Sequence, residues 1–187
     1  MEFNVKNYFG SHQKLFANLD ENSLLEAVDL IKKKFEAGKK IITCGNGGSA
    51  HTASHYITDW NKMTYTYTGK QFKGLCLCDN VGLITAFAND YDYSEVFSGQ
   101  LKSILEKDDL VIGVSGSGNS ENVIKAIDFA NTFGADTLGI VGYDGGKLKE
   151  VAKYNFWVPS FDMQLCEDIH LMFGHITMKT LCNSDIR

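Results

Sequence analysis

Residues 108–127 read DDLVIGVSGSGNSENVIKAI, and they contain a strand pattern, a turn pattern and a helix pattern in succession. The continuous apolar run 110–114 is typical of a fully buried strand. The glycine- and serine-rich residues that follow predict a turn, after which Val123 and Ile127 recur at helical spacing. A strand, a glycine-rich turn and a helix in this order predict one half of a β–α–β unit.

Four other apolar runs of similar length repeat the strand pattern, and helix-like stretches separate them. They are KKIITC (39–44), KGLCLC (73–78), DTLGIVGY (136–143) and YNFWVP (154–159). Helical periodicity precedes the first run, near 3–18 and 21–37, and the residues from 163 to 181 form a closing helix pattern. This rhythm predicts an α/β fold with about five parallel strands, flanked by helices and joined by right-handed crossovers.

No linker divides the chain. The 187 residues include one proline, and the sequence has no low-complexity stretch and no repeat of fixed period. A chain of this length can bury a full core as one unit. We therefore expect a single domain over residues 1–187, with N-terminal helices over about 1–37 and an α/β core over about 38–187.

The composition is that of a folded, water-soluble protein, with 44% hydrophobic and 22% charged residues. The net charge of −5 and the single arginine, Arg187, leave no basic stripe for nucleic-acid phosphates. The N-terminus has no apolar signal region, and no apolar run reaches the roughly 18 residues of a membrane span. We expect a cytoplasmic protein that contacts neither membrane nor nucleic acid.

The cysteines are odd in number and form no CxxC pair, which argues against a disulfide framework or a thiolate zinc site. They are Cys44, Cys76, Cys78, Cys166 and Cys182. Cys76 and Cys78 lie two apart in an apolar run, so on a strand they would share one face as small buried side chains. All five cysteines are interpreted as structural residues of a protein in a reducing compartment.

Two loops predict an anion pocket. The loop Ser115–Ser120 places glycines and hydroxyls before a helix N-terminus, an arrangement that suits a phosphate group, although an ordinary turn with an N-cap would look the same. Residues 45–49, GNGGS, repeat the construction after another strand. Neither loop matches a dinucleotide or a triphosphate motif, so a phosphorylated sugar is the simpler ligand.

Histidines and carboxylates gather in two helical stretches. His55 and Asp59 lie four residues apart on one helix face, in the helix that also carries His51. The closing helix carries a second group, made of Glu167, His170 and His175. Nitrogen and oxygen donors of this kind suit zinc or another divalent transition metal, or an acid/base pair, while a surface ion pair is the alternative.

The order of these motifs resembles the sugar isomerase (SIS) domain and, within it, the sedoheptulose 7-phosphate isomerase family. The motifs are CGNGGSAxxxxH, AND at 88–90, SGSGNSxNVxxA, DGG at 144–146 and ExxHxxxxH. The resemblance extends from about Leu24 to Leu181. It implies the conversion of sedoheptulose 7-phosphate to D-glycero-D-manno-heptose 7-phosphate through an enediol(ate), the first step of bacterial heptose biosynthesis. It also implies a divalent metal such as zinc, and a homotetramer with active sites between subunits.

The resemblance assigns residues to roles. Substrate-binding positions would be Asn46, Gly47, Gly48, Ser49, Asn89, Asp90, Ser115, Gly116, Ser117, Ser120 and Glu167. The metal ligands would be His55, Asp59, Glu167 and His175, with Asp59 and His175 as the catalytic base and acid. The family has glutamate at position 59 and glutamine at position 167, and its arginine shortly after the base helix is absent here, where Lys62 lies near that position.

Helix geometry adds an inference that does not depend on the family. Glu167 and His175 are eight residues apart, about 12 Å along a helix, so one of them would serve a neighbouring subunit or would not be a ligand. The alternative function is a non-catalytic SIS-domain sugar-phosphate sensor or a tetrameric partner module. A sensor needs the serine loop but has no use for a base and a metal cluster, which favours the enzyme.

Overall fold

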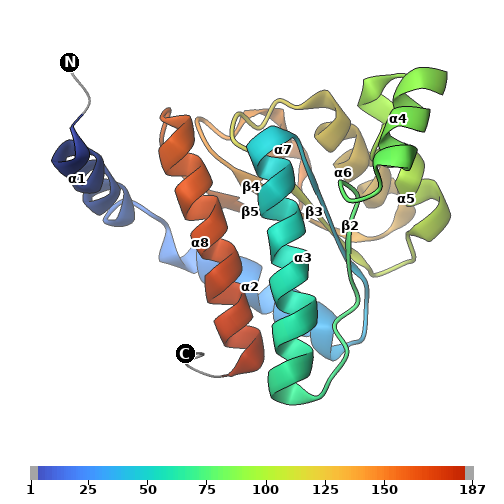
Figure 1. Cartoon of the computed structure of the whole chain (residues 1–187), viewed down its shortest axis with the longest axis horizontal. Coiled ribbons are helices and arrows are strands. Elements are labelled where there is room, and N and C mark those ends of the chain that lie inside the picture. The colour runs from blue at the N-terminus through green and yellow to red at the C-terminus, as the bar shows by residue number, and fades with distance from the viewer. Residues whose placement is uncertain (1–3, 184–187) are drawn as a thin grey trace.

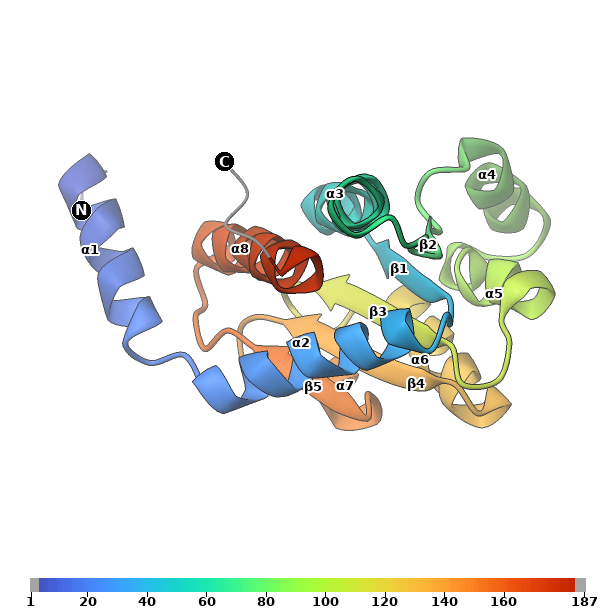
Figure 2. The same ribbon diagram turned by 90° about the horizontal axis from the view of Figure 1, so that it is seen from below.

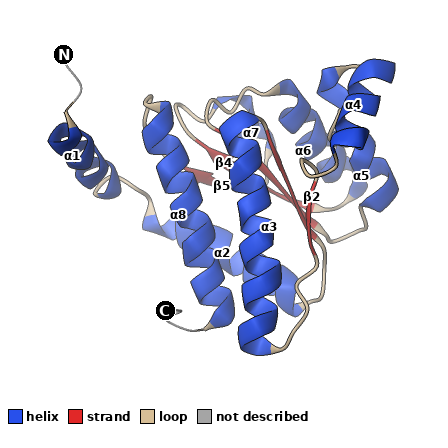
Figure 3. Cartoon of the chain, viewed as in Figure 1, coloured by secondary structure: helices blue, strands red, loops and turns tan. Residues whose placement is uncertain are grey.

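The predicted sheet is present, and all of its strands run parallel (Figure 1, Figure 3). The structure is a computed structural model that describes residues 4–183. Its strands lie in the order β2-β1-β3-β4-β5. They are β1 (Ile41–Gly45), β2 (Gly74–Cys76), β3 (Leu110–Ser115), β4 (Asp136–Val141) and β5 (Tyr154–Trp157). The α/β class with five parallel strands is confirmed.

Helices cover both faces of the sheet. The helices are α1 (Val5–Phe16), α2 (Glu21–Glu36), α3 (Gly47–Thr68), α4 (Val81–Asp90), α5 (Ser98–Ile104), α6 (Glu121–Phe133), α7 (Gly146–Val151) and α8 (Met163–Cys182), with a 3₁₀ turn η1 (Tyr93–Glu95). Helices α2, α3 and α8 pack on the face that carries Ile41 and Leu110. Helices α5, α6 and α7 pack on the face that carries Ile42 and Val111. Successive strand residues thus face two separate cores, as the period of two requires.

The N-terminal helices follow the predicted ranges closely, as α1 and α2, and the closing helix is α8. Figure 2 shows α1 extending away from the body of the molecule. Residues 1–3 and 184–187, which include the predicted start of the first helix and Arg187, lie outside the described residues.

The end of the second predicted strand is wrong. β2 stops at Cys76, and Cys78 lies in a turn, where its thiol donates a hydrogen bond to the Gly45 carbonyl at 3.3 Å. The Leu77 N–H still bonds to the Thr43 carbonyl, so pairing with β1 ends one residue after the strand. Cys76 and Cys78 therefore do not share one strand face. All five cysteines are free thiols.

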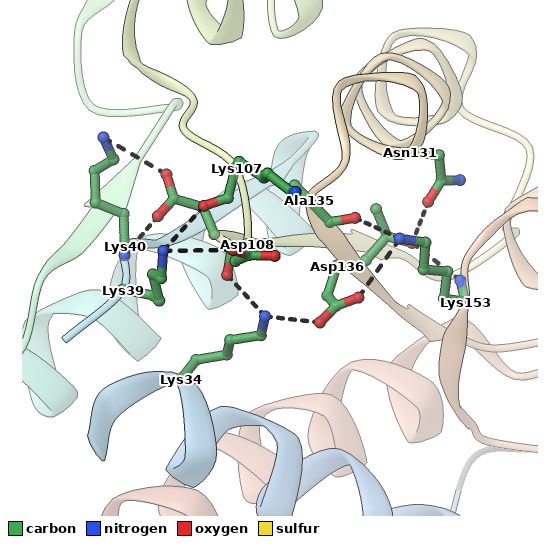
Figure 4. A network of polar contacts seen from close by, with 11 residues as sticks. Lys34, Lys39, Lys40, Lys107, Asp108, Asn131, Ala135, Asp136 and Lys153 are labelled. Carbon is green, nitrogen blue, oxygen red and sulfur yellow. Dashed lines mark hydrogen bonds and ion pairs between the residues drawn. The ribbon is translucent and has the colours of Figure 1, made fainter. Parts of the chain in front are cut away.

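Ion pairs occupy the amino ends of the strands (Figure 4). The loops 45–49 and 115–120 lie at the opposite edge, at the carboxyl ends of β1 and β3. The Lys34 ammonium lies 2.7 Å from an Asp136 carboxylate oxygen, and it also donates to the Asp108 carbonyl at 2.7 Å. Lys153 approaches the second Asp136 oxygen at 3.5 Å. A cavity of about 600 Å³ beside this network is lined mainly by these and other charged side chains. Among its charged residues, Lys34 pairs with Asp136 and Lys39 with Asp108.

Among the described residues, no helix has both the length and the apolar character needed to cross a membrane.

Candidate active site

Strand order brings the two glycine-rich loops together. β1 and β3 are neighbours, and the chain leaves them in opposite directions, from β1 to β2 and from β3 to β4. Such a switch point opens a crevice at the carboxyl ends of the strands. Gly45 of β1 is level with Val114 of β3 in the sheet register. The loops that follow them therefore start side by side.

The loop Ser115–Ser120, called the serine loop below, is folded tightly against the DGG motif at residues 144–146. Gly118 has φ of +67°, and a Cβ there would lie 1.9 Å from the Gly145 carbonyl oxygen, so only glycine fits. The Gly118 carbonyl in turn accepts the Leu148 N–H at 2.8 Å, and the Asn119 side chain accepts the Lys147 N–H at 3.1 Å. The DGG motif at 144–146 is thus a support for the serine loop.

A small polar pocket, called the serine pocket below, lies between the two loops and α8. Its volume is about 160 Å³, which is large enough to admit a small anion such as phosphate. It is lined by Asn46, Ser49, Val114, Ser115, Gly116, Ser117, Ser120, Met163 and Glu167. Ser120 is the N-cap residue of α6 but makes no capping hydrogen bond, and its hydroxyl lies 3.2 Å from that of Ser115. Ser120 therefore leaves the partial positive charge at the start of α6 to a ligand, although the Val123 N–H of the first turn is taken by the Asn122 side chain.

Glu167 closes the pocket from α8. A Cβ at Gly48 would lie 2.4 Å from a Glu167 carboxylate oxygen, so the close approach of these two residues requires glycine at position 48. Gly47 has φ of +53°, the left-handed conformation that glycine adopts freely. The glycines of the first loop thus let the backbone pass beneath the carboxylate.

Helices α3 and α8 run side by side and are fixed by buried hydrogen bonds (Figure 1). The Tyr56 hydroxyl donates to the His170 carbonyl, and the Trp60 indole N–H donates to the Gly174 carbonyl at 3.0 Å. Gly174 allows this contact, because a Cβ there would lie 2.3 Å from the Tyr56 ring. The register of the two helices is therefore set by aromatic residues that directly follow His55 and Asp59.

This register brings His55, Asp59 and His175 together, and these three residues are called the histidine group below. The Nε2 atoms of the two histidines are 3.1 Å apart. The Asp59 carboxylate oxygen lies 3.3 Å from His55 Nε2 and 3.9 Å from His175 Nε2. Their side chains are 43%, 23% and 46% exposed, in the order His55, Asp59, His175. The group is thus open to solvent on one side.

The donor set fits a divalent metal. One ligand atom from each of the three residues lies within 4.8 Å of the others. In a tetrahedral zinc site with bonds of 2.0–2.1 Å, ligand atoms are about 3.3–3.4 Å apart, close to the separations found here. Three protein ligands with one open position are typical of catalytic rather than structural zinc.

Known proteins resemble this chain in both sequence and structure. Residues 7–142 match the SIS domain family model. A phosphoheptose isomerase from Aliarcobacter butzleri is 36% identical over 178 residues, which are 94% of each chain. The chain belongs to the phosphoheptose isomerase family. A phosphoheptose isomerase from Campylobacter concisus is 34% identical over 96% of this chain and 94% of its own. The solved structure of the Neisseria gonorrhoeae phosphoheptose isomerase superposes with a TM-score of 0.87 at 27% identity, covering 96% of this chain and 97% of the other.

Not every residue assigned from the family resemblance lies at the pocket or in the histidine group. Asn89 and Asp90 end α4, where they are exposed and where the Asn89 amide donates to the Asp90 carboxylate at 2.9 Å. Neither lines the serine pocket. His51 is exposed on α3, one turn before His55, and is not part of the histidine group. Contact of Asn89 and Asp90 with sugar stays a prediction.

Glu167 and His175 belong to different groups within one chain. Glu167 lines the serine pocket, whereas His175 joins His55 and Asp59. The separation of about 12 Å along α8 accounts for this division. Metal ligation by Glu167 stays a prediction, and it would need a second chain.

His170, the third member of the closing-helix group, is a core residue. Its side chain is 1% exposed, and within residues 4–183 neither ring nitrogen has a hydrogen-bond partner. Burial lowers the pKa of this imidazole to about 4. His170 is therefore neutral in the folded protein at neutral pH.

We expect this burial to make the protein less stable in acid. Between the unfolded pKa of about 6.5 and the folded pKa, only the unfolded chain binds the proton, so the free energy of unfolding falls as the pH drops through this range. The loss attributable to His170 is about 3 kcal/mol, because one pKa unit corresponds to ~1.4 kcal/mol. Urea unfolding of wild type and His170→Leu between pH 7 and 4 measures it, with His51→Leu as an exposed control. Equal pH dependence in wild type and His170→Leu would contradict the assignment.

Sequence reasoning missed two residues beside the pocket, Tyr93 and Asn122. The Tyr93 hydroxyl donates to the Asn46 side-chain oxygen at 2.9 Å, and Asn122 pairs with the same side chain. Both are separated from Asn46 by long stretches of chain. Asn122 belongs to the motif SGSGNSxNVxxA, but it was assigned no role because it looks like an ordinary residue of the first helical turn, and Tyr93 was assigned none either.

Proposed function

We infer that the chain is a sugar-phosphate isomerase that converts sedoheptulose 7-phosphate to D-glycero-D-manno-heptose 7-phosphate, the first step of bacterial heptose biosynthesis. One observation carries this function. A phosphate-sized serine pocket and a carboxylate flanked by two imidazoles occur in one chain of the phosphoheptose isomerase family. A sugar-phosphate sensor would need the first of these features and not the second.

The serine pocket binds the phosphate. Ser115, Ser117 and Ser120 offer hydroxyl donors, and the N-terminus of α6, which Ser120 does not cap, adds partial positive charge. Glu167 lies on the sugar side, where its carboxylate accepts hydrogen bonds from hydroxyls, since contact with the phosphate would be repulsive. Binding energy from the phosphate then orients the reacting end of the sugar.

Replacing Ser117 by Ala should raise the KM for the sugar phosphate by about 5- to 150-fold, the effect of losing about 1–3 kcal/mol of binding to a charged group. The fold should persist, because the Ser117 hydroxyl accepts only the Asn119 N–H of its own loop. Steady-state kinetics measure the change. Ser103→Ala, a serine on the outer surface of α5, is the control. An unchanged KM in Ser117→Ala would remove Ser117 from the pocket's binding role.

Proton transfer is assigned to Asp59 and His175. Asp59 takes a proton from the carbon beside the ketose carbonyl, and the electrons of that C–H bond form the enediol double bond. His175 gives a proton to the carbonyl oxygen, which becomes the second enediol hydroxyl. In the second half of the reaction, His175 takes the proton of the hydroxyl on the carbon that Asp59 deprotonated, so that this carbon becomes the aldehyde, and the protonated Asp59 returns a proton to the former carbonyl carbon. His55, at 3.3 Å from Asp59, holds the carboxylate in place.

A divalent metal, which we propose to be zinc, is compatible with His55, Asp59 and His175. When bound there, it supplies a Lewis acid that stabilises negative charge on the substrate oxygens. The nitrogen and carboxylate donors, and not thiolates, are those expected of such a catalytic site.

We propose that the chain acts as a homo-oligomer, most simply a tetramer, with active sites between subunits. Within one chain the histidine group and the serine pocket stand at different levels of α8, and a second chain can unite them. Helix α4 supports this assembly, because none of its residues is buried although Val81 and Leu83 are exposed apolar side chains, as is Tyr91 directly after the helix. The five free thiols fit a cytoplasmic location.

Substrate assignment is tested by incubating the purified protein with a panel of ketose phosphates and following aldose formation by NMR. We expect sedoheptulose 7-phosphate to be isomerised, and fructose 6-phosphate to be a poor substrate. A protein that binds these sugars but converts none of them would be a sensor.

A further inference from the structure

Two asparagines form a reciprocal pair at the edge of the serine pocket. Asn46 ends the first loop, and Asn122 lies in the first turn of α6, where it is buried. The Asn46 Nδ2 donates to Asn122 Oδ1 at 2.8 Å, and Asn122 Nδ2 donates to Asn46 Oδ1 at 2.9 Å. The pair thus joins the loop after β1 to the helix after β3.

The orientation of both amides is fixed by outside donors. The Val123 backbone N–H, which can only donate, bonds to Asn122 Oδ1 at 2.9 Å. The oxygen of Asn122 must therefore face that N–H, and its nitrogen must face Asn46. At the other end the Tyr93 hydroxyl donates to Asn46 Oδ1 at 2.9 Å. A flip of either amide would bring two acceptors or two donors together, so only one arrangement satisfies all four bonds.

The pairing diverts Asn46 from a role that its position favours. Asn46 is the N-cap residue of α3, where asparagine commonly accepts a backbone N–H, yet its side chain makes no capping bond. The amide serves Asn122 and Tyr93 instead. A side chain withheld from a stabilising cap indicates that its orientation matters to the site.

The locked amide stands where two cavities meet. Asn46 and Ser120 line both the serine pocket of about 160 Å³ and a neighbouring cavity of about 300 Å³. Tyr93 and Asn122 line the second cavity, together with acidic side chains that include Asp92 and Glu121. Acidic walls disfavour a second phosphate and suit sugar hydroxyls. Among the described residues, Asn46 Nδ2 uses one hydrogen for Asn122, which leaves its other N–H as a donor.

We propose that Tyr93 and Asn122 are positioning residues that orient the Asn46 carboxamide, so that its second N–H donates to a sugar oxygen of the bound sugar phosphate. We call the hydrogen bonds of Asn46 with Asn122 and Tyr93 the lock. Because of the lock, an N–H of Asn46, and not its amide oxygen, faces the junction of the two cavities. This role rests on the proposed function, because it concerns how that substrate is held.

The test is a mutant cycle on kcat/KM for sedoheptulose 7-phosphate. Tyr93→Phe, which removes only the hydroxyl, should lower kcat/KM by about 5- to 10-fold, mainly through KM. Asn46→Ala should lower it at least as much. In the Asn46→Ala background, Tyr93→Phe should have no further effect, since Tyr93 acts through Asn46. Tyr65→Phe, an exposed tyrosine near the end of α3, is the control. Additive losses from Tyr93→Phe and Asn46→Ala would overturn the proposal.

A second measurement does not depend on turnover. In wild type, the Asn46 side-chain amide proton that is bonded to Asn122 should exchange slowly with solvent in NMR spectra, and Tyr93→Phe should speed this exchange without changing the melting temperature. The wild type could fail to isomerise any sugar phosphate and still show slow amide exchange that becomes faster in Tyr93→Phe. In that case the proposed function fails, but the fixed orientation of the two amides stands. Fast exchange of the Asn46 proton bonded to Asn122 in wild type would overturn the fixed orientation of the two amides itself.

Discussion

Replacing Asp59 by Asn should lower the kcat of isomerisation by about 10²–10⁴-fold, the usual contribution of a general base. The amide keeps the size and shape of the carboxylate but cannot accept a proton from carbon. It also loses the negative charge that lies 3.3 Å from His55 Nε2 and 3.9 Å from His175 Nε2. Initial rates with sedoheptulose 7-phosphate measure the effect.

Binding should survive this substitution, because the serine pocket is untouched. The melting temperature of Asp59→Asn should therefore still rise on addition of the sugar phosphate, as ligand binding to the folded state requires. Asp128→Asn, an exposed carboxylate on α6, makes the same chemical change away from the site and should leave kcat unaltered. Wild-type turnover in Asp59→Asn would transfer the role of base to another group, with His175 as the first candidate.

Removal of a divalent metal should also abolish most of the activity. We expect a strong chelator to lower kcat/KM by about 100-fold or more, since stabilisation of a developing oxyanion contributes several kcal/mol. Added zinc should restore the rate. Elemental analysis provides a readout independent of activity, in which His55→Ala should bind less metal than wild type.

His51→Ala is the matched control for the metal, because His51 lies on the same helix, is exposed, and stands outside the histidine group. It should retain both metal and activity. Full activity in protein that contains no metal and ignores chelators would mean that His55, Asp59 and His175 work by acid/base chemistry alone.

Much of the fold was predictable because short stretches of the sequence are enough to indicate each strand and helix. Each buried parallel strand is a continuous apolar run, and the helices between the strands carry a different period. The apolar run KGLCLC is an exception, because its pattern predicts a strand through residue 78, whereas the chain turns after Cys76. β2 leaves the sheet after Cys76 although β1 continues to Gly45, and no local pattern in the sequence encodes that turn.

The site was predictable in part. His55 and Asp59 share a helix face by spacing alone, but their meeting with His175 depends on Gly174, Tyr56 and Trp60, which set how closely α3 and α8 approach. Helix length correctly indicated that Glu167 and His175 could not converge within one chain. The contacts of Asn46 with Tyr93 and Asn122 could not be predicted from the sequence, because they form only when β1 and β3 become neighbours in the sheet.

Deuterium incorporation tests the central claim most directly. With sedoheptulose 7-phosphate in deuterium oxide, wild type should form an aldose that carries deuterium on the carbon that was the carbonyl, and Asp59→Asn should not. This outcome requires an enediol whose proton is exchanged by a side chain. Formation of aldose without label would indicate direct hydrogen transfer, and equal labelling by wild type and Asp59→Asn would contradict the assignment of Asp59 as the base.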